Sequence, residues 1–258
     1  MRVLILGDLH GRHDSLPDIL RNARRDLGIT ACIQVGDFGW TAVAIPRLVR
    51  LPMPVYAIDG NHDDHRFLAA ARRKGLSRRW AKDLDLHLVE RGATLELAGV
   101  AIGLLGGALH AHQAQSTAPA NFVTATDVQS ALKAWRTHKP QVIITHSCPA
   151  GIGVGMHAEQ SLAASVERHC RQAGFDPGPD VDCGEPGLTE LWKAMDWRPK
   201  EWCFGHFHTL HQWSVDGTAF TCVGSGDGTD GSKAVRSVIL DLSEPMVPRV
   251  IAKSGIEI

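Results

Sequence analysis

Short apolar runs recur along the chain and are separated by stretches that can form helices. Runs of this kind are typical of strands buried on both faces, and they span residues 3–6, 31–35, 54–56, 141–144 and 201–204. Helices are predicted between or beside them, over residues 15–25, 41–50, 66–75, 127–137 and 159–173. Strands that alternate with helices favour parallel βαβ units, so the pattern predicts an α/β protein.

Two regions depart from this alternation. Residues 86–89 and 94–97 are short strand-like runs on either side of Arg91-Gly92, which predicts a hairpin. After residue 208 the chain reads as short strands, over residues 212–215, 219–223, 235–240 and 247–251. We therefore expect a single domain over residues 1–258, with two mixed sheets, one from each half of the chain, packed between helical layers.

Charge, hydropathy and cysteine content limit which binding partners and cellular locations are expected. Lys and Arg number 27 and Asp and Glu 28, so the overall charge does not favour nucleic acid or an anionic membrane, although nucleic acid stays possible as a substrate. No apolar run approaches the ~20 residues that cross a bilayer. The six cysteines are far apart in the sequence, without a Cys-x-x-Cys pair, and the first residues enter a strand without a leader. A cytoplasmic location is expected.

Polar side chains follow all five of the strongest apolar runs. A turn beside a solvated histidine would explain one such motif, but not five in series. The carboxyl ends of strands are where α/β sheets bind ligands, and the chain has fourteen histidines. A set of oxygen and imidazole donors suits Mn, Fe, Zn or Co better than Ca or Mg. The candidate donors are Asp8, His10, Asp37, Asn61, His146, His206 and His208.

Taken in order, these motifs resemble the calcineurin-like metallophosphoesterase superfamily over residues 7–208. The motifs are Asp8-Leu9-His10, Gly36-Asp37, Gly60-Asn61-His62-Asp63, His146 and Gly205-His206-Phe207-His208. The resemblance implies a four-layer α/β/β/α sandwich with a dinuclear metal site. Carried over by position, it assigns Asp8, His10 and His208 to the first ion, and Asn61, His146 and His206 to the second. Asp37 would bridge the two ions, and His62 would protonate the leaving oxygen.

The implied activity is hydrolysis of a phosphate ester by in-line attack of metal-bound hydroxide. Two divalent ions, with manganese the first expectation and Fe, Zn or Co as alternatives, would serve this reaction. The protein phosphatase branch continues its second motif with Val-Asp-Arg-Gly, whereas this chain reads Phe38-Gly39-Trp40-Thr41. The motifs are more similar to those of small bacterial and phage members. The missing arginine favours phosphodiesters and leaves Arg12 and His110 as candidate phosphate contacts.

Two alternatives stay open at this point. One is a phosphomonoesterase that acts on a small molecule or a phosphoprotein. The other is a non-catalytic metal-binding scaffold for a protein partner, which an intact set of seven donors argues against. The segment over residues 151–187 is rich in glycine and proline and is expected to contribute to substrate specificity. The sequence specifies no oligomeric state.

Overall fold

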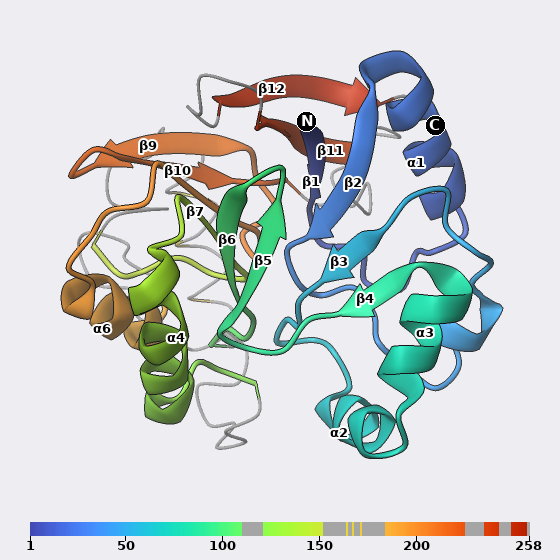
Figure 1. The fold of residues 1–258 in the computed structure, drawn as a ribbon, viewed down its shortest axis with the longest axis horizontal. Coiled ribbons are helices and arrows are strands. Elements are labelled where there is room, and N and C mark those ends of the chain that lie inside the picture. The colour runs from blue at the N-terminus through green and yellow to red at the C-terminus, as the bar shows by residue number, and fades with distance from the viewer. Residues whose placement is uncertain are drawn as a thin grey trace.

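The computed structural model describes residues 1–109, 121–151, 164, 167, 171, 184–224, 235–242 and 249–256. Its strands form two six-stranded sheets that lie next to each other in the centre of the molecule (Figure 1). Helices cover the outer sides of both sheets, with α1, α2 and α3 beside the first sheet and α4 and α6 beside the second. The result is the expected four-layer α/β/β/α sandwich with two mixed sheets.

The first sheet has the strand order β12-β11-β1-β2-β3-β4. Four of its strands run parallel: β1 (Arg2–Leu6), β2 (Ile29–Gln34), β3 (Val55–Ala57) and β4 (Leu86–Leu88). The last two strands of the chain, β11 (Val235–Asp241) and β12 (Arg249–Ile256), return to this sheet in antiparallel pairs. The expectation that each sheet comes from one half of the chain was therefore wrong, because the first sheet combines strands from both ends.

The second sheet has the order β5-β6-β7-β8-β10-β9. Its parallel centre consists of β6 (Val100–Leu105), β7 (Val142–Thr145), β8 (Glu201–Phe204) and β10 (Thr218–Cys222). Antiparallel strands flank it on both sides, namely β5 (Ala93–Leu97) and β9 (His211–Val215). In both sheets, each candidate donor follows one of the parallel strands, namely β1, β2, β3, β7 or β8.

Alternating side chains on the parallel strands fill three cores. On β1, Leu4 and Leu6 face the helices while Val3 and Ile5 face the other sheet, and all four are fully buried. On β7 the same alternation places Ile143 in the core between sheet and helices, and Val142 and Ile144 in the core between the two sheets. Burial on both faces explains why these strands read as continuous apolar runs. The loops at their carboxyl ends are therefore held by rigid elements.

Two of the five described α-helices begin at a residue whose side chain caps the helix. The five are α1 (Leu16–Leu27), α2 (His65–Arg73), α3 (Leu76–Leu84), α4 (Ala125–His138) and α6 (Pro186–Ala194). Thr124 and Asp127 form a capping box at the start of α4, and Asp64 caps α2 by accepting from the Phe67 N–H. Such caps satisfy N–H groups that have no partner within the helix.

One expectation about local structure was wrong, and two helices were not expected. Residues 41–50 form only a short 3-10 helix, η1 (Ile45–Arg47). Pro46 lies in the middle of this stretch, and proline both lacks an N–H and disfavours helical geometry in the residue before it. Helices α3 and α6 were not foreseen. The helix expected over residues 159–173 lies almost entirely outside the described residues.

The predicted hairpin around Arg91-Gly92 was also wrong, because the two strands belong to different sheets. Strand β4 pairs with β3 in the first sheet, whereas β5 pairs with β6 in the second. The hairpin turn lies instead at Ala98-Gly99, where both residues have positive φ. Arg91 crosses between the sheets, held by carboxylates on either side. The expectation of a single domain over residues 1–258 stays a prediction.

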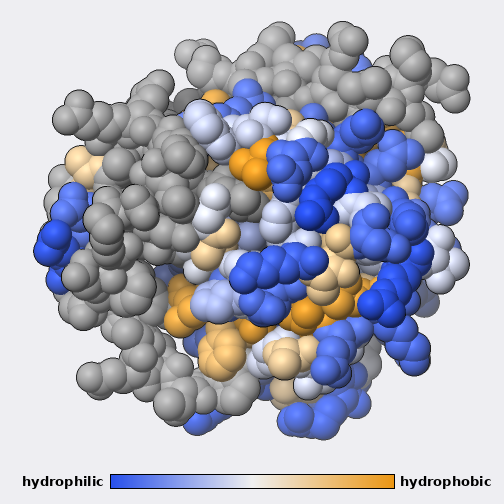
Figure 2. All heavy atoms as spheres, turned by 90° about the vertical axis from the view of Figure 1, so that its left-hand side faces the viewer, coloured by the Kyte–Doolittle hydropathy of each residue, from blue (hydrophilic) through white to orange (hydrophobic). Residues whose placement is uncertain are grey.

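On the side of the molecule that carries α6 and β9, most of the coloured residues are hydrophilic, with hydrophobic side chains among them (Figure 2). Isolated hydrophobic side chains of this kind are normal on a protein surface. Within the described ranges, no helix has both the length and the apolar character needed to cross a bilayer.

Candidate metal centre

The loops that follow β1, β2, β3, β7 and β8 bring the seven predicted donors to one end of the two sheets. Four of the donors, Asp8, Asp37, Asn61 and His146, are at most 3% exposed. The side chains of His10 and His208 are 25% and 37% exposed. The centre therefore has a buried side and an open side.

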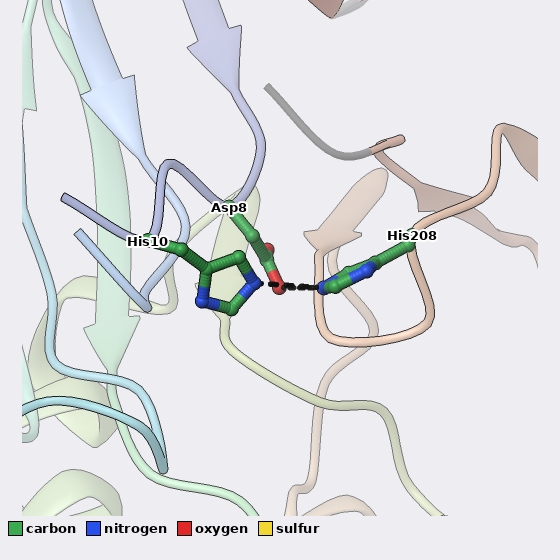
Figure 3. A group of neighbouring side chains, drawn as sticks. All are labelled: Asp8, His10 and His208. Atoms are coloured by element: carbon green, nitrogen blue, oxygen red, sulfur yellow. Dashed lines mark hydrogen bonds and ion pairs between the residues drawn. The ribbon is translucent and has the colours of Figure 1, made fainter. Parts of the chain in front are cut away.

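Asp8, His10 and His208 form the open side (Figure 3). The Nε2 atoms of the two histidines lie 3.1 Å apart, and Nε2 of His208 lies 3.0 Å from an Asp8 carboxylate oxygen. These three donor atoms all lie within 4.8 Å of one another. Two imidazole nitrogens that point at the same carboxylate suit a divalent cation with mixed nitrogen and oxygen ligands.

Asp37, Asn61 and His146 form the buried side. Nε2 of His146 lies 3.0 Å from the Asn61 side-chain oxygen and 3.3 Å from an Asp37 oxygen. On the other edge of the ring, Nδ1 lies 2.8 Å from the Val35 carbonyl oxygen. A carbonyl can only accept, so Nδ1 carries a proton, and in the neutral ring Nε2 is the nitrogen free to bind a cation.

Asp37 lies next to both sides of the centre. Its Oδ2 atom is 3.3 Å from Nε2 of His146 and 3.9 Å from Nδ1 of His10. Its other oxygen accepts from the His62 backbone N–H at 2.7 Å. Asp8 also reaches both sides, because the donor atoms of Asp8, Asp37 and His146 lie within 4.8 Å of one another. Two buried carboxylates this close together repel each other unless positive charge lies between them.

The charges of the surrounding groups match a site for cations. Burial alone would raise the pKa of Asp37, but the neighbouring histidines, above all His146, outweigh burial and hold it below its usual value. Burial would likewise lower the pKa of His146, but Asp37 and Asp8 raise it to about 10. In the protein without metal, a proton on His146 thus supplies the positive charge. A divalent ion would supply it instead, so the residues present fit a metal.

His206 contributes through both its backbone and its ring. Its N–H donates to the Asp8 carboxylate at 3.2 Å from each oxygen. Its ring lies edge-on to that of His146, with the centroids 5.2 Å apart. Burial, and next the charge on His146, lower the pKa of His206 well below its usual value. The ring is therefore neutral at physiological pH, which is the form that binds metals.

His62 lies at the open edge of the centre. Its ring is edge-on to that of His10, with a centroid separation of 5.4 Å, and the residue is exposed. Its backbone N–H is anchored on Asp37, so the side chain projects from a fixed point. Burial of part of the ring lowers its pKa, although Asp37 opposes this shift.

Four donors adopt a backbone conformation that is rare for residues other than glycine. The φ angles of His10, Asp37, His206 and His208 are 47°, 53°, 67° and 54°. Among the described residues only eight non-glycine residues have positive φ, and half of them are candidate ligands. Such backbone strain persists only where the surrounding structure enforces it, and it concentrates at functional sites.

Glycines beside three of the donors make room for donors from other loops. A Cβ atom at Gly36 would overlap the His146 ring, and one at Gly60 would overlap the Asp37 carboxylate. A Cβ atom at Gly205 would overlap the Asp8 carboxylate. Each glycine thus lets its own strand end approach the side chain contributed by a different strand.

Two buried aspartates that the sequence did not single out hold the loops together. The carboxylate of Asp63 accepts from the backbone N–H groups of Gly39, Trp40 and Gly60 at 2.8–3.0 Å. It thereby ties the loop after β2 to the loop after β3. Its position as the last residue of the Gly-Asn-His-Asp motif was the signal available in the sequence.

Asp59 links the first sheet to the second. Arg91 donates to Asp59 at 2.6 and 3.0 Å, and also to Asp127 at the start of α4 at 3.1 Å. Burial opposes the ionised form of Asp59, but Arg91 outweighs it and lowers the pKa. This ion network fixes the two halves of the centre relative to each other. No feature of the sequence identified Arg91 as its partner.

The two predicted phosphate contacts are not tested by this geometry. Arg12 is an exposed residue in the loop between β1 and α1. His110 lies outside the described residues, as does most of the segment over residues 151–187.

Comparison with known proteins identifies relatives of this fold. The model of the family described as calcineurin-like phosphoesterase matches residues 1–210. No curated protein sequence matches the chain significantly. One crystal structure shares the fold with a TM-score of 0.63, at 15% identity and with 98% of each chain covered. A putative 5'-nucleotidase from Staphylococcus aureus, solved in complex with alpha-ketoglutarate, has a TM-score of 0.54 at 15% identity. That match covers 98% of this chain and 53% of the nucleotidase chain.

Proposed function

The chain belongs to the calcineurin-like phosphoesterase family, and we propose that this metal-dependent phosphoric ester hydrolase acts through a dinuclear centre formed by its seven clustered donors. The observation that carries the proposal is the position of Asp37, whose Oδ2 faces His146 on the buried side and His10 on the open side. A carboxylate shared in this way would hold two divalent ions close enough to act together.

We assign the donors to two ions by their side of the centre. Asp8, His10 and His208 would hold the first ion, and Asn61, His146 and His206 the second, with Asp37 between them. The distances within each cluster support this division. When bound, the ions would activate a water molecule and neutralise charge on the phosphoryl group.

The metals proposed are transition ions, with manganese first and iron, zinc or cobalt as alternatives. The support is the donor set, in which imidazoles from four histidines accompany oxygens from Asp8, Asp37 and Asn61. Magnesium and calcium prefer ligand sets made of oxygen. Mixed nitrogen and oxygen donors do not by themselves distinguish among the four transition ions.

His62 is proposed to donate the proton that the leaving oxygen needs. Its exposed ring at the open edge can meet a substrate without leaving the backbone anchor on Asp37. General acid catalysis matters most for a poor leaving group, such as an alkoxide, because a stable phenolate can depart without a proton.

Phosphodiesters are the substrates that this site favours. The residues after Asp37 are Phe38, which is fully buried, then Gly39, then Trp40, which is also fully buried. They pack into the core and provide no cation for a phosphate. A diester carries one negative charge and a monoester up to two, so a site with few cationic side chains suits the diester better. A phosphomonoesterase is the alternative.

A cytoplasmic location is proposed on the state of the described cysteines. Cys32, Cys148, Cys203 and Cys222 are buried free thiols. Reduced thiols of this kind are typical of compartments that keep cysteines reduced.

The test compares bis(p-nitrophenyl) phosphate with p-nitrophenyl phosphate. Chelator-stripped protein would be reloaded with Mn, Fe, Zn, Co or Mg in turn before each assay. We expect turnover with a transition ion and a preference for the diester. A preference for the monoester would contradict the diester assignment, and turnover with magnesium alone would contradict the choice of metals.

A further inference from the structure

Helices α2 and α3 and the turn between them concentrate positive charge on one part of the surface. Residues 65–82 contain seven Lys and Arg residues and no Asp or Glu. The rest of the chain has 20 Lys and Arg against 28 Asp and Glu, which is an excess of negative charge. The near-neutral total charge therefore results from a strong local separation of charge, and a local positive field attracts anions whatever the total.

Both helices bury one face and expose their cations on the opposite face. With 3.6 residues per turn, α2 buries Leu68 and Ala71, and α3 buries Trp80. All three buried side chains belong to the same core, so the exposed faces of the two helices point away from it together. The two helices also lie next to each other beside the first sheet (Figure 1). The exposed cations opposite the buried faces are Arg66, Arg73, Arg78 and Lys82.

These four residues and the exposed Lys74 form what we call the basic surface. The neighbouring Arg72 and Arg79 are paired with carboxylates, at 2.9 Å from Glu90 and 3.2 Å from Asp83. By contrast, no carboxylate of the described residues forms an ion pair with any of the five cations of the basic surface. Like charges four positions apart on a helix, as at Arg78 and Lys82, destabilise it. A bound polyanion would supply the missing negative charge.

Helix α2 begins directly beside the metal centre. Its first residue, His65, is three positions after His62, and Nε2 of His65 lies 2.9 Å from the Gly60 carbonyl oxygen. Gly60 in turn packs so closely on Asp37 that a Cβ atom would overlap the carboxylate. Arg66 follows in the first turn of the helix, four positions after His62. The basic surface therefore starts next to the centre.

The extent of the basic surface favours a polymer as its ligand. Helices α2 and α3 have nine residues each, and a helix of that length spans about 13 Å. Helix α3 ends where β4 begins, at the end of the first sheet opposite to the centre. A single phosphate ester is too short to contact both the centre and Lys82. Phosphates of one DNA strand follow each other at about 3.4 Å along the axis, so a strand of several nucleotides has the required length.

An anionic membrane suits this surface less well than a nucleic acid. Helices that bind a bilayer insert large apolar side chains between the lipids. Among the described residues, the exposed large hydrophobic side chains are Val43, Val49, Leu109 and Trp213, and none of them belongs to α2 or α3. The same observation leaves no exposed aromatic ring there to stack on bases. The contacts available are therefore contacts to phosphates, which carry no sequence information.

We propose that the basic surface of α2 and α3 binds the phosphodiester backbone of a nucleic acid strand whose scissile diester lies at the metal centre. The inference rests on the proposed function, since it names the substrate class of that centre. The five cations would hold the strand on one side of the scissile bond. Such binding is independent of base sequence and weakens with salt, because the bound phosphates release their counterions.

The first test measures binding and does not depend on turnover. Chelator-stripped protein would be titrated into a fluorescein-labelled oligothymidylate at several NaCl concentrations, with fluorescence anisotropy as the readout. We expect wild-type protein to bind, and more weakly as salt rises. Arg73→Gln/Arg78→Gln/Lys82→Gln keeps good helix formers but removes three cations. At about 0.7 per phosphate contact, it should lower the slope of log affinity against log salt by about 2, and weaken binding at low salt at least about tenfold.

The matched control is Lys133→Gln/Arg136→Gln/Lys193→Gln, which removes the same charge from exposed positions of α4 and α6 beside the second sheet. It should bind the oligonucleotide like wild-type protein. With metal restored, the kcat/KM of the first triple variant should fall at least about tenfold on the oligonucleotide. Its kcat/KM on bis(p-nitrophenyl) phosphate should stay at the wild-type value, because this small diester does not reach the basic surface.

The outcomes separate this inference from the proposed function. Failure of wild-type protein to bind the oligonucleotide at low salt, or equal weakening in both triple variants, would overturn the inference. Hydrolysis of the small diester without hydrolysis of the oligonucleotide would overturn the substrate class alone. Binding to phosphatidylserine vesicles but not to the oligonucleotide would assign the surface to a membrane instead. If no diester is hydrolysed with any metal, the proposed function fails, and the anisotropy titration alone decides whether the surface binds nucleic acid.

Discussion

The two sides of the metal centre differ in how firmly the protein holds them. On the buried side, Asp37 and His146 are almost completely enclosed, and the Val35 carbonyl fixes the His146 ring from behind. On the open side, the side chains of His10 and His208 are 25% and 37% exposed. We infer that the buried ion would be bound tightly and exchange slowly, whereas the open ion would exchange readily and face the substrate.

The largest loss of activity should follow removal of the negative charge of Asp37, the carboxylate that lies next to both sides. Asp37→Asn keeps the shape of the side chain but cannot balance two ions. We expect binding of fewer than two ions and a loss of more than about 100-fold in kcat/KM, since even residues outside the coordination sphere cost 10–100-fold. Metal analysis of purified protein and diester kinetics would measure both. Full activity with two ions bound would show that Asp37 is not the bridge.

His146→Ala should damage the buried side in stability as well as in metal binding. In metal-free protein the change leaves Asp37 buried without its main partner, and removal of one member of a buried ion pair costs about 3–5 kcal/mol. Urea unfolding of the chelator-treated proteins would measure the difference. A loss below about 1 kcal/mol would mean that Asp37 is compensated by another group.

His62→Ala should slow the reaction without changing the metal content. A general acid contributes about 10²–10⁴-fold, so we expect a loss of about 100-fold with an alkoxide leaving group and a much smaller loss with nitrophenolate. Kinetics on one diester of each kind would test the difference, with metal analysis as the control. The same loss with both leaving groups would exclude His62 as the acid.

On the open side, His208→Gln should have a milder effect than His146→Ala. The side chain is 37% exposed, and its partner Asp8 keeps the His206 backbone N–H as a donor when His208 is replaced. We expect binding of one ion to weaken by at least about tenfold, since outer-shell partners alone cost 10–100-fold, with the free energy of unfolding of the metal-free protein little changed. If His208→Gln destabilised the metal-free protein as much as His146→Ala, the distinction between the two sides would be wrong.

A pH dependence of stability is also expected in metal-free protein. The pKa of His146 is raised from 6.5 to about 10, so its contribution to stability is complete below pH 6.5 and is lost as the pH rises through 10. The pKa of Asp37 is lowered, so the stability that its ionised form contributes is complete above its usual pKa of 3.8 and is lost only at lower pH. It therefore does not change between pH 6 and pH 9. The free energy of unfolding of metal-free wild-type protein should therefore be lower at pH 9 than at pH 6. In His146→Ala the difference between the two pH values should be smaller.

The sequence predicted the donors because each follows a buried strand, and parallel strands that end together must bring such residues together. The relation of Asp37 to both clusters could not be predicted in this way, since it depends on distances across loops. The positive φ angles of His10, Asp37, His206 and His208 could not be predicted either, because aspartate and histidine do not by themselves indicate this conformation. The sequence showed glycines at positions 36, 60 and 205 but not the reason for them. In the structure each lies so close to a donor from another loop that a Cβ atom would overlap it.

The errors in the fold came from connections between elements. Arg91-Gly92 looked like a hairpin turn because polar residues and glycine separate two apolar runs. The structure instead uses Arg91 to bind Asp59 in one half and Asp127 in the other, a pairing across 32 and 36 positions that local pattern cannot reveal. Over residues 41–50 the expected α-helix does not form around Pro46, and only the short η1 is present.

The central claim, that two ions share Asp37, is tested most directly by electron paramagnetic resonance during a manganese titration of metal-free protein. We expect the first equivalent to give the six-line signal of an isolated ion on the buried side. The second equivalent should replace it with the broad spectrum of an exchange-coupled pair, and Asp37→Asn should not show this change. A six-line signal that persists in wild-type protein with two ions bound would contradict a shared carboxylate.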